Sequence, residues 1–189
     1  MKQNERFKLL LNWLEELPDA SYANIQEASS DASFRRYYRV WNGELSYIVM
    51  DAPPLKEDNH RFVRYSELFH RMGLNCPEII EANYNDGFFV LTDLGSQHYL
   101  ERILDDQGMQ INLYNDALSE LLKLQVNGSK IVKEFPSYNH SLLSEEMNLF
   151  VDWFCTKELK YIFTKKELSQ WEACTQILAT NALNQPQVL

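Results

Sequence analysis

The sequence predicts an α+β fold in which a five-stranded antiparallel sheet with one inserted helix is followed by helices alone. Three observations support this prediction. Strand-like runs fill the chain up to about residue 92, and Asn42-Gly43 joins two of them with the residues that a tight hairpin turn needs. Asn85-Asp86-Gly87 gives a second hairpin signal. From Ser96 onward, apolar residues recur only at helical spacing.

The chain begins with a predicted amphipathic helix. Asn4 is placed to cap its first turn and Pro18 to end it. The apolar positions at helical spacing are Phe7, Leu10, Leu11, Leu14 and Leu17. Residues 1–19 are therefore assigned to a leading helix.

Five runs have the composition of strands. Pro53 and Pro54 end the third run, because proline cannot donate a hydrogen bond to a neighbouring strand. A helix follows, with Asp58 as its cap and Gly73 at its end. The five strands are expected at about residues 24–28, 34–41, 45–51, 78–84 and 88–92.

Asp93-Leu-Gly95 forms the natural seam between the mixed part and the helical part of the chain. The last predicted helix is introduced by a capping box between Thr164 and Glu167. The helices are expected at residues 99–104, 113–125, 142–154 and 168–183. The predicted organisation is thus a leading helix at 1–19, a small lobe at 20–95 and a helical lobe at 96–189.

Composition restricts the class of partner. The 189 residues include 27 acidic and 18 basic ones, a formal net charge of −9, which opposes binding to nucleic acid. A local basic cluster at Arg35, Arg36 and Arg39 suits a small anion better than a polymer. The three cysteines lack disulfide or zinc spacing, and no signal peptide or membrane span is evident. A cytoplasmic location without membrane contact is expected.

Four motifs follow one another along the chain: Ser30-Asp-Ala-Ser-Phe-Arg-Arg-Tyr37, Ile48-Val-Met-Asp-Ala-Pro-Pro54, Phe89-Val-Leu-Thr-Asp-Leu-Gly95 and the helix from Glu145 to Phe154. Together they resemble one known family, the aminoglycoside phosphotransferase-like family, which has a protein-kinase-like fold. The match is strongest to its bacterial branch of amino-sugar kinases of cell-wall recycling, which phosphorylate N-acetylmuramate and N-acetylglucosamine at the anomeric hydroxyl. The resemblance implies a small lobe that binds ATP and a helical lobe that binds a small sugar.

The turn Ser30, Asp31, Ala32 and Ser33 is the candidate phosphate-binding segment. Small residues let main-chain amides approach a phosphate closely, and hydroxyl groups add donors. Local composition alone favours an ordinary polar hairpin turn. The resemblance favours the phosphate-binding role.

Arg36 is the second candidate for the nucleotide site. It shares one face of its strand with Phe34, Tyr38 and Val40, so its guanidinium needs a partner there. A phosphate could serve, as could the carboxylate of Asp31 or Asp51. The alternative is a bulge that turns Arg36 outward.

Met50 occupies the position at which kinases usually carry a phosphate-binding lysine. The amino-sugar kinase branch is similar in this respect, so the resemblance implies that Met50 lies in the nucleotide site. Thr92, Asp93 and Leu94 fall at the junction of the lobes, where main-chain groups of kinase-like proteins bind the adenine edge. A polar linker with no ligand would have the same sequence.

Glu146 and Asp152 are the candidate sugar-binding residues. They lie on a helix whose apolar stripe is expected to be buried, and they could accept hydrogen bonds from sugar hydroxyls. The stripe consists of Leu143, Met147, Phe150 and Phe154. Acidic residues on a helix also commonly form its solvent-exposed side.

The sequence contains no His-x-Asp-x-x-x-x-Asn pattern, and no aspartate follows Asp152. Phosphoryl transfer needs an aspartate for the acceptor and groups that hold magnesium, so no catalytic or metal-binding residue is assigned, and the magnesium ligands are expected to be absent. The chain is expected to be the amino-terminal part of a sugar kinase that is inactive alone. The alternative is a non-catalytic module that binds a nucleotide or a partner. Self-association is expected through an uncovered apolar face of residues 168–183.

Overall fold

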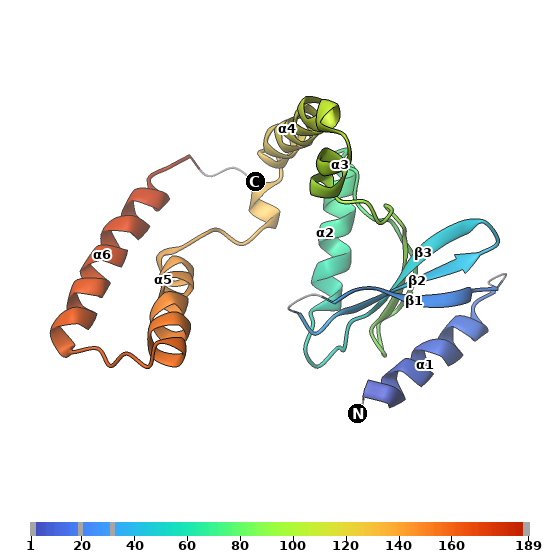
Figure 1. Cartoon of the computed structure of the whole chain (residues 1–189), viewed down its shortest axis with the longest axis horizontal. Coiled ribbons are helices and arrows are strands. Elements are labelled where there is room, and N and C mark those ends of the chain that lie inside the picture. The colour runs from blue at the N-terminus through green and yellow to red at the C-terminus, as the bar shows by residue number, and fades with distance from the viewer. Residues whose placement is uncertain (1–2, 19–20, 31–32, 187–189) are drawn as a thin grey trace. The chain divides into compact units, whose positions relative to one another are not determined.

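The computed structural model describes residues 3–18, 21–30 and 33–186 and confirms the α+β fold (Figure 1). Five strands and one helix, α2, follow the leading helix α1, and the rest is helical. The strands are β1 (Ala23–Ser30), β2 (Arg36–Asn42), β3 (Leu45–Asp51), β4 (Ile79–Asn83) and β5 (Phe88–Thr92). The α-helices are α1 (Gln3–Glu16), α2 (Asn59–Arg71), α3 (Tyr99–Asp105), α4 (Gln110–Gly128), α5 (His140–Leu149) and α6 (Lys165–Leu183).

The strands form one antiparallel sheet in the order β1-β2-β3-β5-β4. Helix α2 connects β3 to β4. In the sheet, β5 lies between these two strands, so β4 is an edge strand. Asp58 caps α2 as predicted, by accepting a hydrogen bond from the Arg61 amide at 3.0 Å. Gly43 and Gly87 adopt positive φ in the two predicted hairpin turns.

Each face of the sheet packs against a different helix, so alternate residues of a strand belong to different cores. The first core joins α1 to the sheet and consists of Leu10, Leu14, Tyr38, Val40, Val49, Phe88 and Val90. The second contains Met50, Ala52, Phe89 and Leu91, with Phe62 and Val63 of α2 packed against it. We call these surfaces the α1 face and the α2 face.

The structure corrects one predicted helix. Residues 142–154 were expected to be a single α-helix, but α5 ends at Leu149 and a π-helix runs from Phe150 to Glu158. Phe150 and Phe154, expected in its buried stripe, are 49% and 50% exposed and stack on each other at 5.5 Å. The wider π turn displaces the residues beyond Leu149 from the register of an α-helix.

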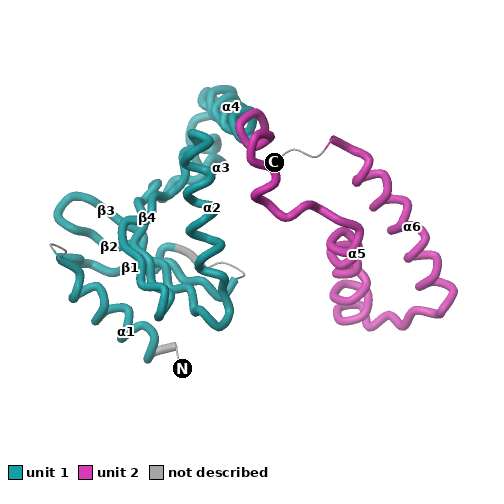
Figure 2. The backbone as a smooth tube through the Cα atoms, turned by 180° about the vertical axis from the view of Figure 1, so that it is seen from behind, with its two compact units in different colours: residues 1–124 teal, residues 125–189 magenta. Residues whose placement is uncertain are grey.

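The chain divides into two compact units, residues 1–124 and residues 125–189 (Figure 2). The sheet, α1 and α2 lie in the first unit, and α5 and α6 lie in the second. On α6, Leu168, Ile177 and Leu178 are 44%, 68% and 60% exposed, in keeping with the predicted apolar face. Self-association through that face stays a prediction. Within the part of the chain that the structure describes, no helix is long and apolar enough to cross a membrane.

Candidate functional site

The predicted phosphate-binding turn lies between β1 and β2. Ser30 ends β1, whereas Asp31 and Ala32 lie outside the described residues. Ser33 is exposed, and its hydroxyl oxygen accepts a hydrogen bond from the Arg35 amide at 3.1 Å. The described end of the turn is therefore held in a compact local conformation that leaves Ser33 open to solvent.

Glu57 fastens this end of the turn to the segment before α2. Its Oε1 atom accepts a hydrogen bond from the Phe34 amide at 3.2 Å, and its Oε2 atom lies 3.0 Å from Nε of Arg35. The Arg35 guanidinium also lies over the ring of Phe62, 5.1 Å from its centre. The charge of Arg35 is thus balanced by a carboxylate of the chain itself.

Arg36 lies on the α1 face, as its alternation with Tyr38 and Val40 predicted. It stands opposite Asp51 in the register of β2 and β3. The Asp51 carboxylate, however, accepts hydrogen bonds from Nε and Nη2 of Arg6, at 3.0 and 2.5 Å. Nη1 of Arg36 is buried without a hydrogen-bond partner among the described residues. A role for Arg36 at the nucleotide remains a prediction, and its guanidinium belongs to the side of the sheet that α1 covers.

Met50 lies on the α2 face and is fully buried. It stands opposite Tyr37 on β2 and Phe89 on β5. The residue at the usual lysine position is therefore part of the hydrophobic core. Any contact of Met50 with a nucleotide would be an apolar one.

A lysine at this position should not be tolerated in this chain. Met50→Lys would place an ammonium group in a site that excludes water, so we expect a loss of at least about 3 kcal/mol in the free energy of unfolding. Met50→Leu, which keeps the volume and the apolar character, should cost less than about 1.5 kcal/mol. Urea unfolding of both variants measures the difference, and equal stability of the two would contradict the assignment of Met50 to the core.

The predicted adenine-binding linker follows β5. The Thr92 amide donates to the Glu78 carbonyl at 2.9 Å, and the Thr92 hydroxyl accepts from the Glu78 amide at 2.9 Å. Beyond it, the Asp93 carboxylate binds Arg39, with 2.5 Å between Nε and Oδ2 and 3.0 Å between Nη2 and Oδ1. Leu94 is 58% exposed. Thr92 and Asp93 are thus held in place by hydrogen bonds, and Leu94, which follows them, is exposed.

The Arg39–Asp93 pair shifts the titration of the carboxylate. The hydrogen bond from Arg39 lowers the pKa of Asp93 from 3.8 to about 2, and the amide of Gly95 contributes in the same direction. Because the folded state binds the proton more weakly than the unfolded chain, this stabilisation is complete above pH 3.8 and is lost as the pH falls towards 2.

We therefore expect Asp93 to make the stability of the first unit sensitive to acid. Between pH 5 and pH 2 the free energy of unfolding of the wild type should fall by about 2 kcal/mol more than that of Asp93→Asn. Urea unfolding at a series of pH values, with the two curves subtracted, isolates this contribution from the other carboxylates. Curves that stay parallel over this range would show that the pair does not lower the pKa of Asp93.

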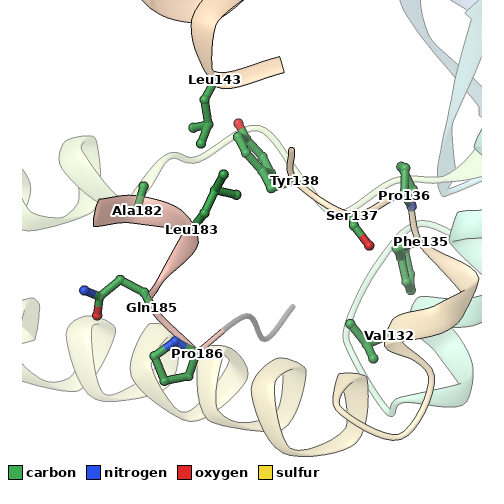
Figure 3. A pocket seen from close by; sticks show the side chains of 10 residues that line it. All are labelled: Val132, Phe135, Pro136, Ser137, Tyr138, Leu143, Ala182, Leu183, Gln185 and Pro186. Carbon is green, nitrogen blue, oxygen red and sulfur yellow. The ribbon is translucent and has the colours of Figure 1, made fainter. Parts of the chain in front are cut away.

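Two of the cavities that the described residues line lie near the candidate segments or in the second unit. One, of about 580 Å³, lies beside α2 in the first unit and is lined by Arg35, Glu57, Phe62, Tyr65, Phe69 and Pro77, among others. The other, of about 400 Å³, lies in the second unit between the segment 132–138, the beginning of α5 and the end of α6 (Figure 3). The first reaches the end of the predicted phosphate-binding turn through Arg35, but its lining includes none of the predicted nucleotide-binding residues.

The predicted sugar-binding residues lie in the second unit. Glu146 belongs to α5 and Asp152 to the first turn of the π-helix, and both are exposed. Neither lines the cavity of Figure 3. Their exposure would allow both side chains to contact a sugar. Their role in sugar binding remains a prediction. Across residues 3–18, 21–30 and 33–186, no group of three His, Cys, Asp or Glu side chains could hold a metal ion.

Sequence reasoning missed the carboxylate partners of the basic cluster. Arg35 and Arg39 were expected to attract a small anion, but Glu57 and Asp93 already neutralise them. Glu57 lies just before the cap of α2, and Asp93 directly follows β5. An acidic residue close to the end of a helix or strand is the sequence signal for such a partner. The strand order is needed to show which arginine each carboxylate contacts.

Comparison with known proteins agrees with this architecture. Residues 24–127 match the family model described as "Phosphotransferase enzyme family". The N-acetylmuramate/N-acetylglucosamine kinase of Pseudomonas aeruginosa is 34% identical over 198 aligned residues, which cover 100% of this chain and 57% of that protein. The proteins of the same name from Pseudomonas putida and Neisseria meningitidis are 38% and 34% identical, over 88% and 95% of this chain and 48% and 53% of their own lengths.

The chain thus spans about half the length of the curated relatives that it matches. The matched residues 24–127 include nearly the whole sheet, helix α2 and the linker after β5. With more than half of its residues matched, the chain belongs to the phosphotransferase enzyme family.

Proposed function

We propose that this chain is the nucleotide-binding part of an ATP-dependent phosphotransferase that acts on a small amino sugar in the cytoplasm. The names of the relatives support the sugar class, since the three compared above are all N-acetylmuramate/N-acetylglucosamine kinases. The observation that carries the proposal is the linker after β5. Neither the amide nor the carbonyl of Leu94 has a hydrogen-bond partner among the described residues, and its side chain is 58% exposed.

Such a linker suits a purine base, because the base edge needs one donor and one acceptor from the protein in a fixed geometry. Main-chain groups of Asp93 and Leu94 offer both. In this proposal Thr92 orients the linker from β5. Ser30, Asp31, Ala32 and Ser33 cover the phosphates, as their small side chains allow.

The remaining parts of the proposed site are less complete. The roles of Arg36 in phosphate neutralisation and of Met50 in an apolar contact with the nucleotide stay predictions, because Arg36 lies on the α1 face and the fully buried Met50 lies on the α2 face. Glu146 and Asp152 are assigned to the sugar hydroxyls. The described residues do not fit a magnesium site, because they contain no cluster of metal-binding side chains. The proposed roles of these residues therefore include no contact with that ion.

We also propose that these 189 residues bind ATP without transferring phosphate on their own. Phosphoryl transfer depends on positioning and on charge stabilisation by an acceptor-orienting aspartate and bound metal. The sequence has no His-x-Asp-x-x-x-x-Asn pattern that would supply them. The nucleotide-binding part is therefore expected to need these residues from elsewhere.

A fusion protein tests the proposal. Residues 1–189 are joined to the part of the Pseudomonas aeruginosa relative that the alignment leaves uncovered, and phosphate transfer from ATP to N-acetylmuramate and N-acetylglucosamine is measured. We expect transfer by the fusion and none by residues 1–189 alone.

Two substitutions at one exposed position provide matched controls. Leu94→Ala keeps the main-chain amide and should leave the activity of the fusion nearly unchanged. Leu94→Pro removes that N–H group and should abolish it. A folded fusion that phosphorylates neither sugar would refute the proposed activity. Equal activity of the alanine and proline variants would refute the role of the linker.

A further inference from the structure

Arg39 connects the middle of the sheet to the linker. It lies on the α2 face of β2, opposite Ile48 of β3. Its Nε and Nη2 atoms both donate to the Asp93 carboxylate, and Nη2 also donates to the Gly95 carbonyl at 3.0 Å. One side chain thus holds both the first and the last residue of the segment 93–95.

The pair differs from an ordinary surface ion pair. The side chains of Arg39 and Asp93 are 20% and 4% exposed, whereas those of the pair Lys123–Glu120 are 50% and 41% exposed. Exposed pairs contribute little, because water screens them and their side chains lose entropy. The planar guanidinium, by contrast, binds a carboxylate through two nitrogens in one geometry. Arg39 therefore fixes the position of the Asp93 carboxylate as well as balancing its charge.

The segment 93–95 has a defined conformation within this clamp. The Gly95 amide donates to Oδ1 of Asp93 at 2.9 Å, which closes a tight turn around Leu94. Gly95 has a φ of +96°, a backbone conformation that glycine adopts without strain. Thr92 is fixed separately through its two hydrogen bonds with Glu78. Leu94 is left as the exposed residue between fixed neighbours.

We propose that Arg39 is a positioning residue for base recognition, holding the segment 93–95 in the conformation in which its main-chain groups meet the edge of a purine. The inference rests on the proposed nucleotide-binding function and deepens it. Arg39 itself does not bind phosphate, because two of its nitrogens are committed to the linker. The preorganised linker binds the base without first having to be ordered, which favours affinity.

The consequence for ligand binding is selective. Loss of the clamp should weaken binding of the base and leave binding of the phosphates unchanged. Arg39→Lys keeps the positive charge but not the two-nitrogen geometry. Lys123→Met, which removes an exposed ion pair in the same unit, is the control for the loss of an ordinary surface ion pair. Adenosine and inorganic tripolyphosphate serve as separate probes of the two parts of the nucleotide.

The experiment is calorimetric titration of the 189-residue chain with each probe. Arg39→Lys should weaken adenosine binding about tenfold, the effect of one lost hydrogen bond, with tripolyphosphate binding within about twofold of the wild type. Lys123→Met should change neither. Unchanged adenosine binding by Arg39→Lys, or an equal loss of both probes, would overturn the inference while leaving the proposed function intact. A wild type that binds no adenosine would overturn both.

A second measurement needs no variant. In the wild-type chain, the Nε–H proton of Arg39 and the amide proton of Gly95 should be protected from exchange with solvent before any ligand is added. NMR measures this exchange directly. Protection that appears only after adenosine is added would show that the ligand orders the linker, which contradicts preorganisation by Arg39.

Discussion

Replacing Arg6 with methionine is expected to reduce the free energy of unfolding of the first unit by about 3–5 kcal/mol. Asp51 is only 2% exposed, and Arg6 supplies the charge that compensates it. Arg6 also donates to the Asp86 carbonyl at 2.7 Å and lies over the ring of Phe88, 5.1 Å from its centre. The substitution leaves a buried carboxylate without its partner. Native-state hydrogen exchange of the Val49 and Val90 amides, in the middle of the sheet, measures the loss for this unit alone.

The double variant Arg6→Met with Asp51→Leu separates the two contributions. Removing both charges leaves no uncompensated group, so the double variant should be more stable than Arg6→Met. If Arg6→Met alone costs less than about 1 kcal/mol, Arg6 does not compensate Asp51. The buried pair would then have no part in fastening α1 to the sheet.

Replacing Gly87 with alanine is expected to have an effect of similar size. A Cβ atom at this position would lie 2.0 Å from the Ala52 carbonyl oxygen and 2.9 Å from Nδ2 of Asn59. The Ala52 oxygen is fixed by a hydrogen bond from Asn59 Nδ2 at 2.9 Å, and the Ala52 amide donates to the Gly87 carbonyl at 2.8 Å. The backbone would have to move apart, so we expect a loss of more than about 3 kcal/mol in the free energy of unfolding.

Gly43→Ala is the matched control for Gly87→Ala. Gly43 has a similar positive φ of +63°, but no atom lies within 4 Å of a Cβ placed there. Only the conformational cost remains, about 1 kcal/mol. Urea unfolding of the two variants therefore separates the close approach from the backbone conformation. Equal losses would show that the contact of Gly87 with Ala52 is unimportant.

Local sequence pattern predicted the elements well where the pattern was strong. The third and fifth strands were expected at residues 45–51 and 88–92, and β3 and β5 have these bounds. Both are apolar runs next to turn residues. The helix expected at 142–154 was wrong beyond Leu149, because apolar spacing does not distinguish an α-helix from the π-helix that follows.

The candidate site was predictable only in part. The alternation of side chains along β2 correctly predicted that Arg36 and Tyr38 share one face of the sheet. No local pattern shows which helix covers that face. The partners of the charged residues are equally non-local, since 45 residues separate Arg6 from Asp51 and 54 separate Arg39 from Asp93. These pairs depend on the order of strands in the sheet and on the packing of α1. The nucleotide and sugar roles of the candidate residues stay predictions.

Titration of the isotopically labelled 189-residue chain with ATP, followed by NMR, tests the central claim of nucleotide binding most directly. We predict saturable, one-to-one shifts of the amides of Asp93 and Leu94 in the linker, together with those of Ser33 and Phe34 at the phosphate-binding turn. Amides in both segments that stay unmoved at saturating ATP would contradict the claim that this unit holds the nucleotide between them.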